Sequence, residues 1–153
     1  MRRDQRSGDH RHSTPAPAPR PGNLPLELNA FVGRTAELAA LTAALESARL
    51  ITVTGVGGVG KSRLAVRAAA DRAPRDGAWL VELSAVRDPD LVEHAVADAL
   101  RLTDHTHRTP RKVIVDHLAQ REVLLVVDGF EHLVEACSSL VRDLLHRCPG
   151  LRV

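Results

Sequence analysis

One segment of the chain matches every fixed position of the phosphate-binding pattern G-x-x-x-x-G-K-[ST] and reads Gly55-Val56-Gly57-Gly58-Val59-Gly60-Lys61-Ser62. Glycines let backbone N–H groups approach phosphate oxygens closely, and a following helix directs partial positive charge at them. We expect Lys61 to reach the β- and γ-phosphates and Ser62 to ligate Mg²⁺. The segment therefore predicts a site for a nucleoside triphosphate with magnesium, and ATP is the expected nucleotide.

An acidic residue at the end of a buried strand would supply the second half of such a site. Residues 123–127 are wholly apolar, and Asp128 follows them one strand–helix unit after the glycine motif. We predict that Asp128 is the Walker B residue and shares the Mg²⁺ with Ser62. The alternative is that Asp128 simply caps the next helix.

Two other nucleotide classes compete with ATP. Gly55, Gly57 and Gly60 also spell G-x-G-x-x-G, and Glu82 lies 22 residues beyond Gly60, which is the dinucleotide-binding spacing. That reading leaves the adjacent lysine and serine, and the later aspartate, without a role, so the triphosphate reading is favoured. No N-K-x-D motif that could read guanine occurs, so GTP is not expected.

The residues around these motifs predict strands that alternate with helices. Strands are expected at 50–54, 78–83 and 123–127, with a fourth beginning at 151–153. Helices are expected after Thr35 as N-cap, at 61–72, after Asp88-Pro89, from Thr109-Pro110 to about Gln120, and around 133–145, ended by Cys148-Pro149-Gly150. This order predicts an α/β fold of the P-loop NTPase type, with three α/β/α layers around a parallel sheet.

The chain divides into a tail and one domain. Residues 1–22 are rich in Pro and Arg and are expected to be disordered, whereas 23–153 form the nucleotide-binding domain. The tail holds five arginines against two aspartates, so the rest of the chain is slightly acidic although the whole carries a formal charge of +2. The basic pI is therefore no sign of a nucleic-acid surface on the domain.

The remaining reactive side chains are expected to be structural. Cys137 and Cys148 are predicted to be small core residues of one helix in a reducing, cytoplasmic protein, and no segment could span a membrane. His105 and His107 are expected in a solvated loop rather than at a metal site. Trp79 is expected in the core at the edge of a strand.

From residue 23 onward the chain resembles the nucleotide-binding domain of STAND-class (NB-ARC/AAA-like) P-loop NTPases of bacterial LuxR-type and AfsR-like transcriptional regulators. The resemblance rests on residues 23–28, 31–34, 55–64, 79–83, 87–89, 124–133 and 148–153. It implies nucleotide contacts from Val32, Gly33 and Arg34 near the adenine and ribose, and from Arg63 beside the glycine motif. Alternatively, Phe31 and Val32 only staple the following helix.

The resemblance also implies a slow ATP/ADP switch whose output lies elsewhere. Nucleotide state would control self-association or contacts with C-terminal domains, and a separate domain would bind DNA. Position 129, often acidic in hydrolysing P-loop ATPases, is Gly129, so Glu131 is the nearest candidate base. The family pattern of Asp, a short gap and then Glu-His matches Asp128, Glu131 and His132. In related folds a fourth strand inserts between the Walker A and Walker B strands, and this chain stops as that strand starts. The sheet is therefore expected to be incomplete at its C-terminus.

We interpret the chain as an ATP- or ADP-binding module of a STAND-type regulator, an N-terminal fragment with slow or absent hydrolysis. One alternative is a small P-loop kinase or transferase. Another is a remnant that binds no nucleotide. Direct DNA binding by this chain is not expected, because the tail is too short for a helix-turn-helix and the domain is not basic.

Overall fold

The computed structural model describes residues 21–26, 33–72, 74–103 and 107–153. In chain order the elements are α1 (Thr35–Ser47), α2 (Lys61–Arg72), β1 (Ala78–Glu82), the 3₁₀ helix η1 (Pro89–Leu91), α3 (Val92–Ala99), α4 (Pro110–Leu118), β2 (Val123–Asp128), α5 (Val134–Arg147) and β3 (Leu151–Arg152). Most of the predicted tail, Val32 and His105 lie outside the described residues.

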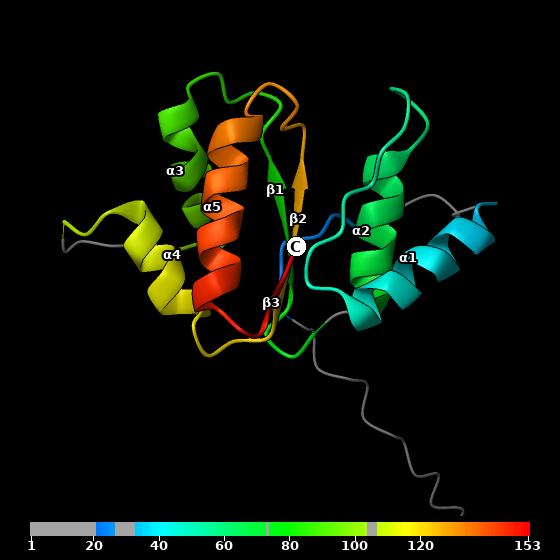
Figure 1. Cartoon of the computed structure of the whole chain (residues 1–153), viewed down its shortest axis with the longest axis horizontal. Helices are drawn as coiled ribbons and strands as arrows, with labels where there is room; N and C mark the ends of the chain where they lie inside the picture. The colour runs from blue at the N-terminus through cyan, green and yellow to red at the C-terminus, as the bar shows by residue number, and fades with distance from the viewer. Residues whose placement is uncertain (1–20, 27–32, 73, 104–106) are drawn as a thin grey trace, which may run out of the picture.

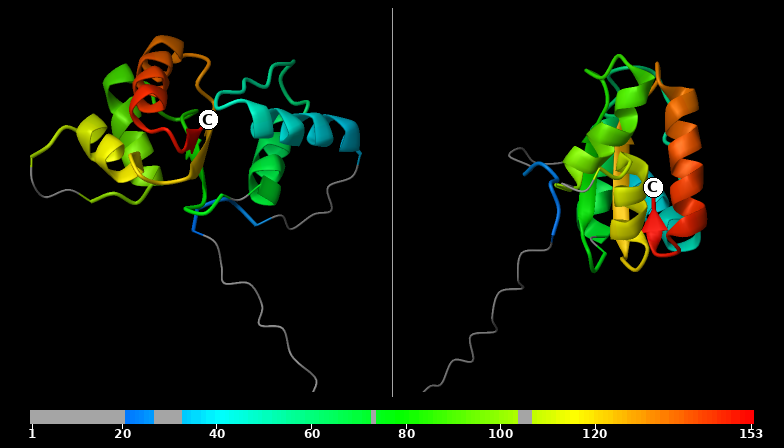
Figure 2. Two further views of the ribbon diagram at one scale, coloured as in Figure 1. Left: turned by 60° about the horizontal axis from the view of Figure 1, so that its bottom comes forward. Right: turned by 90° about the vertical axis from the view of Figure 1, so that its left-hand side faces the viewer.

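The three strands form a parallel sheet in the order β1-β2-β3. Helices α1 and α2 lie on one side of the sheet, and α3, α4 and α5 lie on the other (Figures 1 and 2). The predicted α/β class with a parallel sheet is thus confirmed.

The strands feed two apolar cores because successive side chains point to opposite faces of the sheet. Val123 and Leu125 of β2 belong to the larger core, which α3, α4 and α5 cover. Leu124 and Val126 belong to the smaller core, which contains Leu45 of α1 and alanines of α2. Strand β2 is therefore buried on both faces, which explains its unbroken apolar sequence.

Two helix starts follow the predicted capping chemistry, and one does not. The Asp88 carboxylate accepts a hydrogen bond from the Asp90 N–H, and the Thr109 hydroxyl accepts one from the Lys112 N–H. Thr35, predicted as an N-cap, is instead the first helical residue of α1, and Arg34 precedes it with a left-handed φ of 55°. The sharp turn at Arg34 moves the helix start by one residue.

The strand predicted at 50–54 does not form. Residues 50–54 adopt no regular secondary structure. Among the described residues, only two backbone hydrogen bonds join residues 49–54 to the sheet: the Val153 N–H donates to the Arg49 carbonyl, and the Ile51 N–H donates to the Val153 carbonyl. Leu50, at the start of this segment, is 52% exposed. A strand requires a partner along its length, and β3 ends after two residues, so the segment from Thr52 onward lacks one.

The first described residues complete the opposite edge of the sheet. Gly22 forms an isolated parallel bridge with Ala78. The Asn23 side chain accepts a hydrogen bond from the Leu80 N–H at 2.6 Å and donates to the Leu80 carbonyl at 2.9 Å. The edge of β1 is thereby paired with the chain that leads into the domain.

The predicted burial of both cysteines and of Trp79 is confirmed, although Cys148 caps the end of α5 (Val134–Arg147) rather than lying within it. Cys137 and Cys148 are buried and free, and Trp79 is 9% exposed at β1. Among the described helices, none is long and apolar enough to cross a membrane.

Candidate functional site

The glycine motif forms an exposed loop that runs directly into the first turn of α2. Gly58 and Gly60 have φ values of 78° and 82°, a region that residues with a side chain rarely adopt. A β-carbon at Gly57 or Gly58 would meet no atom within 4 Å. The loop therefore needs glycine for its path and leaves its backbone open to a ligand.

Lys61 is the first residue of α2, and its amine folds back over the loop. The Lys61 Nζ donates to the carbonyls of Gly55 and Val56 at 3.0 and 3.1 Å. Ser62 and Arg63 follow in the first turn and are exposed. The N-terminus of α2 thus faces the same space as a lysine ammonium, an arrangement that favours anions.

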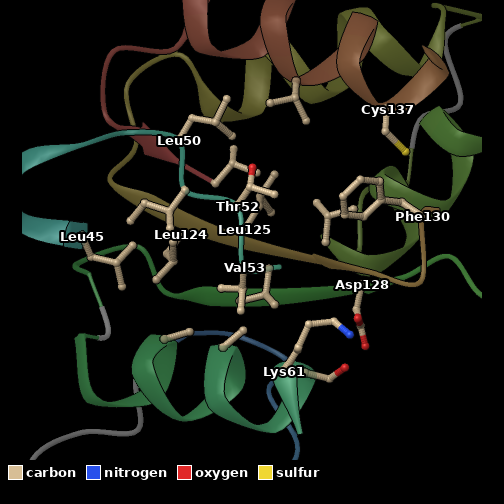
Figure 3. A pocket seen from close by; sticks show the side chains of 18 of the residues that line it. Leu45, Leu50, Thr52, Val53, Lys61, Leu124, Leu125, Asp128, Phe130 and Cys137 are labelled. Carbon is tan, nitrogen blue, oxygen red and sulfur yellow. The ribbon is translucent and has the colours of Figure 1, made fainter. Parts of the chain in front are cut away.

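Asp128 ends β2 at the same end of the pocket as Lys61 (Figure 3). It is half-buried, and its carbonyl accepts a hydrogen bond from the Leu83 N–H at 2.8 Å. Its place at the carboxyl end of a parallel strand is where α/β folds bind ligands. Lys61 and Asp128, 67 positions apart in the sequence, are therefore brought together by the sheet.

Arg34 reaches the glycine loop from the start of α1. Its Nη1 donates to the Val59 carbonyl at 2.6 Å, and its Nε contacts a Glu37 carboxylate oxygen at 3.3 Å. Backbone hydrogen bonding at the helix start and the Arg34 side chain lower the pKa of Glu37. Glu37 was not among the predicted site residues, although its i, i+3 spacing from Arg34 could have indicated the pair.

The three residues Gly129, Glu131 and His132 follow Asp128 in the loop after β2 (Val123–Asp128). Gly129 has a φ of 69°, and a β-carbon there would lie 2.8 Å from the Ser84 backbone N. Glu131 is exposed and lines the pocket, and a ring nitrogen of His132 lies 2.5 Å from the Val86 carbonyl oxygen. Among the described residues, Asp128 and Glu131 are the two carboxylates that line the pocket.

Gly33 is described and exposed, whereas Val32 lies outside the described residues. Within the described part of the chain, no cluster of three or more His, Cys, Asp or Glu side chains could hold a metal ion by itself. Ser62 and Asp128 offer two oxygen ligands. This number suits Mg²⁺, which usually takes one or two protein ligands and completes its shell with waters and phosphate oxygens.

The strand order argues against a dinucleotide site. In dinucleotide-binding folds, the strand that carries the acid lies beside the strand that enters the glycine loop. Here Glu82 ends β1, which is separated from the 49–54 segment by β2 and β3. Three strand spacings amount to about 14 Å, so Glu82 is too far from the loop to play that part.

A pocket of about 820 Å³ extends from Lys61 and Asp128 along the sheet. Residues 50–55 line one side of it and residues 124–131 line the other. Leu45 and Leu50 lie at the end away from Lys61 (Figure 3). The candidate phosphate site is thus the polar end of a longer, mostly apolar opening.

Comparison with known proteins finds one matching family and two kinds of relative. A family model described as "Novel STAND NTPase 1" matches residues 25–148. A Mycobacterium tuberculosis protein named "Putative HTH-type transcriptional regulator" is 37% identical over 113 residues, which are 74% of this chain and 13% of the relative. An uncharacterized protein of the same organism is 38% identical over 128 residues, 82% of this chain and 33% of the relative.

The same two relatives occur in Mycobacterium bovis with the same identities and coverage. The chain therefore spans a third or less of the length of these curated relatives. No solved structure matches the chain.

Proposed function

The chain belongs to the novel STAND NTPase 1 family, and from this premise we propose that it is the nucleotide-binding module of a STAND-type regulator. The module binds ATP or ADP with Mg²⁺ at residues 55–62. One observation carries the proposal: Lys61 and Asp128 point into the same end of one pocket, beside an open glycine loop and a helix N-terminus.

Each residue of the site has a distinct part in binding. Lys61 exchanges its hydrogen bonds to the Gly55 and Val56 carbonyls for the β- and γ-phosphate oxygens. The loop backbone from Val56 to Gly60 presents its N–H groups to the same phosphates. Ser62 and Asp128 hold Mg²⁺, which offsets the charge of the phosphates.

The segment before α1, residues 32–34, is proposed to bind the adenosine part of the nucleotide. Gly33 and Arg34, with Val32, are proposed to contact the adenine and ribose. The Arg34 hydrogen bond to Val59 ties this segment to the glycine loop, which supports a shared role. Arg63, exposed in the first turn of α2, is proposed to lie beside the phosphates.

Hydrolysis is proposed to be slow or absent. The position after Asp128 is held by Gly129, where a side chain would collide with Ser84. Glu131 is exposed at the pocket mouth and is the candidate base. A module that binds tightly and hydrolyses slowly is suited to switching rather than to turnover.

The module is proposed to be part of a larger cytoplasmic regulator of the NB-ARC-like, LuxR-type or AfsR-like kind. The name of one relative, an HTH-type transcriptional regulator, supports this setting. Partners are then a second copy or further domains of the regulator, with DNA contacted by another domain rather than by this chain. A small P-loop kinase or transferase is the alternative, but no observation favours it.

Calorimetry with Mg²⁺ and ATP tests the proposal, with ADP, GTP and NAD as competitors. Lys61→Ala and Asp128→Ala each remove a charge-assisted contact, so each should weaken ATP binding at least about 10-fold. Lys112→Ala is the matched control, because Lys112 is the only other lysine and is exposed on α4.

Three outcomes decide between the readings. ATP or ADP binding that is lost in Lys61→Ala and kept in Lys112→Ala supports the module. Binding of NAD that survives Lys61→Ala would contradict it. A folded wild-type chain that binds no nucleotide would favour the remnant.

A further inference from the structure

Strand β1 ends in a carboxylate, Glu82, that lies beside Asp128. The two strands run parallel, and Glu82 is the register partner of Asp128 at the last paired position. Neighbouring strands lie about 4.8 Å apart. The sheet therefore places a second carboxylate one strand spacing from the proposed Mg²⁺ ligand, at the carboxyl ends of the strands, where α/β folds bind ligands.

The side chain of Glu82 lies on the face of the sheet that α2 covers. Side chains alternate between the two faces along a strand. In β1, Leu80 packs against the smaller core beneath α2, whereas Val81 belongs to the larger core. Glu82 is the next residue on the α2 face, and it is exposed. In β2 the same alternation puts Asp128 on the α2 face, two positions after Val126.

The polar end of the site is one strand away from Glu82, although the 49–54 segment is three strand spacings away. Helix α2 packs against β1 and β2 through the smaller core, and its first residue, Lys61, lies beside Asp128 (Figure 3). The distance that excludes Glu82 from a dinucleotide site therefore does not exclude it from the terminal phosphate.

The end of β1 is held in place by β2 and the residue that follows it. The Leu83 N–H donates to the Asp128 carbonyl at 2.8 Å. Ser84 packs so closely against Gly129 that a β-carbon on the glycine would lie 2.8 Å from the Ser84 backbone N. Glu82, directly before these contacts, thus stands on a fixed backbone, as a side chain that must orient a reacting molecule requires.

Glu131 is less well placed to act on a phosphate held by Lys61. Phe130, the residue before it, packs against the larger core. It lies on the α5 side of β2, whereas Lys61 lies on the α2 side (Figure 3). The chain therefore leaves the α2 face after Asp128, and Glu131 follows in an exposed turn.

We propose that Glu82, rather than Glu131, holds and activates the water that attacks the γ-phosphate of ATP, which rests on the proposed nucleotide binding. The water oxygen bonds to the γ-phosphorus, and the bond from that phosphorus to the β,γ-bridging oxygen breaks, leaving its electron pair on ADP. One proton of the water passes to the Glu82 carboxylate and then to solvent, and the other leaves with inorganic phosphate. Hydrolysis is then slow rather than absent.

Single-turnover hydrolysis and calorimetric ATP affinity, both with Mg²⁺ and the whole chain, test the proposal. Glu82→Gln removes the charge and keeps the shape of the side chain. Hydrolysis should fall at least about 10-fold, whereas the Kd for ATP should stay within about 2-fold, because Glu82 contacts the water and not the nucleotide. Glu122→Gln is the matched control, since Glu122 is exposed at the amino end of β2.

A binding measurement gives a second readout that needs no turnover. ADP with aluminium fluoride imitates the phosphoryl group during its transfer to water. Wild type and Glu122→Gln should bind this complex at least about 10-fold more tightly than ADP alone, and Glu82→Gln should lose that gain. Glu82→Asp keeps the charge on a shorter side chain, so it should recover part of both the hydrolysis and the gain.

The outcomes separate the water-holding role from the proposed nucleotide binding. Hydrolysis and analogue binding that both fall in Glu82→Gln, at unchanged ATP affinity, support the role. Unchanged hydrolysis in Glu82→Gln, a larger fall in Glu131→Gln, or a wild-type chain that binds ATP without hydrolysing it would overturn the role and leave nucleotide binding intact. Loss of ATP affinity in Glu82→Gln to the same extent as hydrolysis would make Glu82 a binding residue and would also overturn it. A chain that binds no ATP removes both proposals.

Discussion

Gly129 packs so closely against Ser84 that a β-carbon on Gly129 would lie 2.8 Å from both the Cβ and the backbone N of Ser84. Gly129 also has a φ of 69°, which favours glycine. The contact joins the segments that follow β1 and β2, directly beside Asp128. The path of the backbone and the close contact with Ser84 therefore favour glycine at the position after Asp128.

Gly129→Glu should therefore destabilise the fold without restoring hydrolysis. The strained φ and the collision with Ser84 should together cost about 2 kcal/mol or more of unfolding free energy, measured by urea denaturation. Gly57→Ala is the control, because its β-carbon would meet nothing within 4 Å. A Gly129→Glu chain as stable as wild type, or one that gains ATPase activity, would contradict this account.

How far the sequence predicts this structure depends on whether the controlling contacts are local. The limits of α2 and the body of β2 are predictable, because the glycine motif and an unbroken apolar run specify them locally. The strand at 50–54 is not, because it depends on a partner about 100 residues away that pairs only through Val153.

One contact of the candidate site could also be predicted from the sequence, and another could not. The sequence predicts that Lys61 and Asp128 lie in one site, because strand–helix alternation brings the carboxyl ends of parallel strands to the same edge of the sheet. Both residues line the pocket. The hydrogen bond from Arg34 to Val59 depends on a left-handed turn at Arg34, for which the sequence pattern gives no signal.

Arg34→Ala should loosen the glycine loop. Arg34 links the Val59 carbonyl to the Glu37 carboxylate, so its loss frees residues 56–60 and should speed amide hydrogen exchange there. ATP binding should weaken by about 5- to 10-fold, the loss expected for one hydrogen bond to a charged group. Arg75→Ala, at an exposed arginine in the turn before β1, is the control. Unchanged exchange in Arg34→Ala would show that the link does not order the loop.

Asn23→Ala should weaken the edge of β1. The Asn23 side chain bonds both the N–H and the carbonyl of Leu80 and donates to the Ala99 carbonyl at 3.3 Å. Removing it leaves part-buried backbone groups without these partners, which should cost about 1 to 3 kcal/mol in a denaturation experiment. Asn23→Asp keeps the acceptor for Leu80 N–H and loses the donors, so it should fall between alanine and wild type. An alanine variant as stable as wild type would mean that water replaces the side chain.

His117 should make the fold less stable in mild acid. Burial, and then the charge of Arg121, lower the pKa of His117 below its usual 6.5. The unfolded chain thus takes up a proton first, and the contribution of His117 is complete above pH 6.5 and is lost as the pH falls below it. The loss should be about a few tenths of a kcal/mol, because His117 is only half-buried. Denaturation of His117→Gln at pH 7.5 and 5.5 should show a smaller difference than wild type, with exposed His94→Gln as control.

Cys137 should be the more reactive of the two thiols, although both are slow. Burial raises the pKa of Cys137 and of Cys148, so little thiolate forms at neutral pH. Cys137 lines the pocket, whereas Cys148 is fully buried and its thiol donates to the Val115 carbonyl at 3.8 Å. Iodoacetamide should therefore modify Cys137 first, and the rate should rise as the pH approaches 9.

Mass spectrometry after timed alkylation measures this order, and single variants assign it. Cys137→Ser should remove the faster phase, whereas Cys148→Ser should leave it unchanged. Equal rates at both thiols would mean that modification follows global unfolding, because only the unfolded chain exposes them alike.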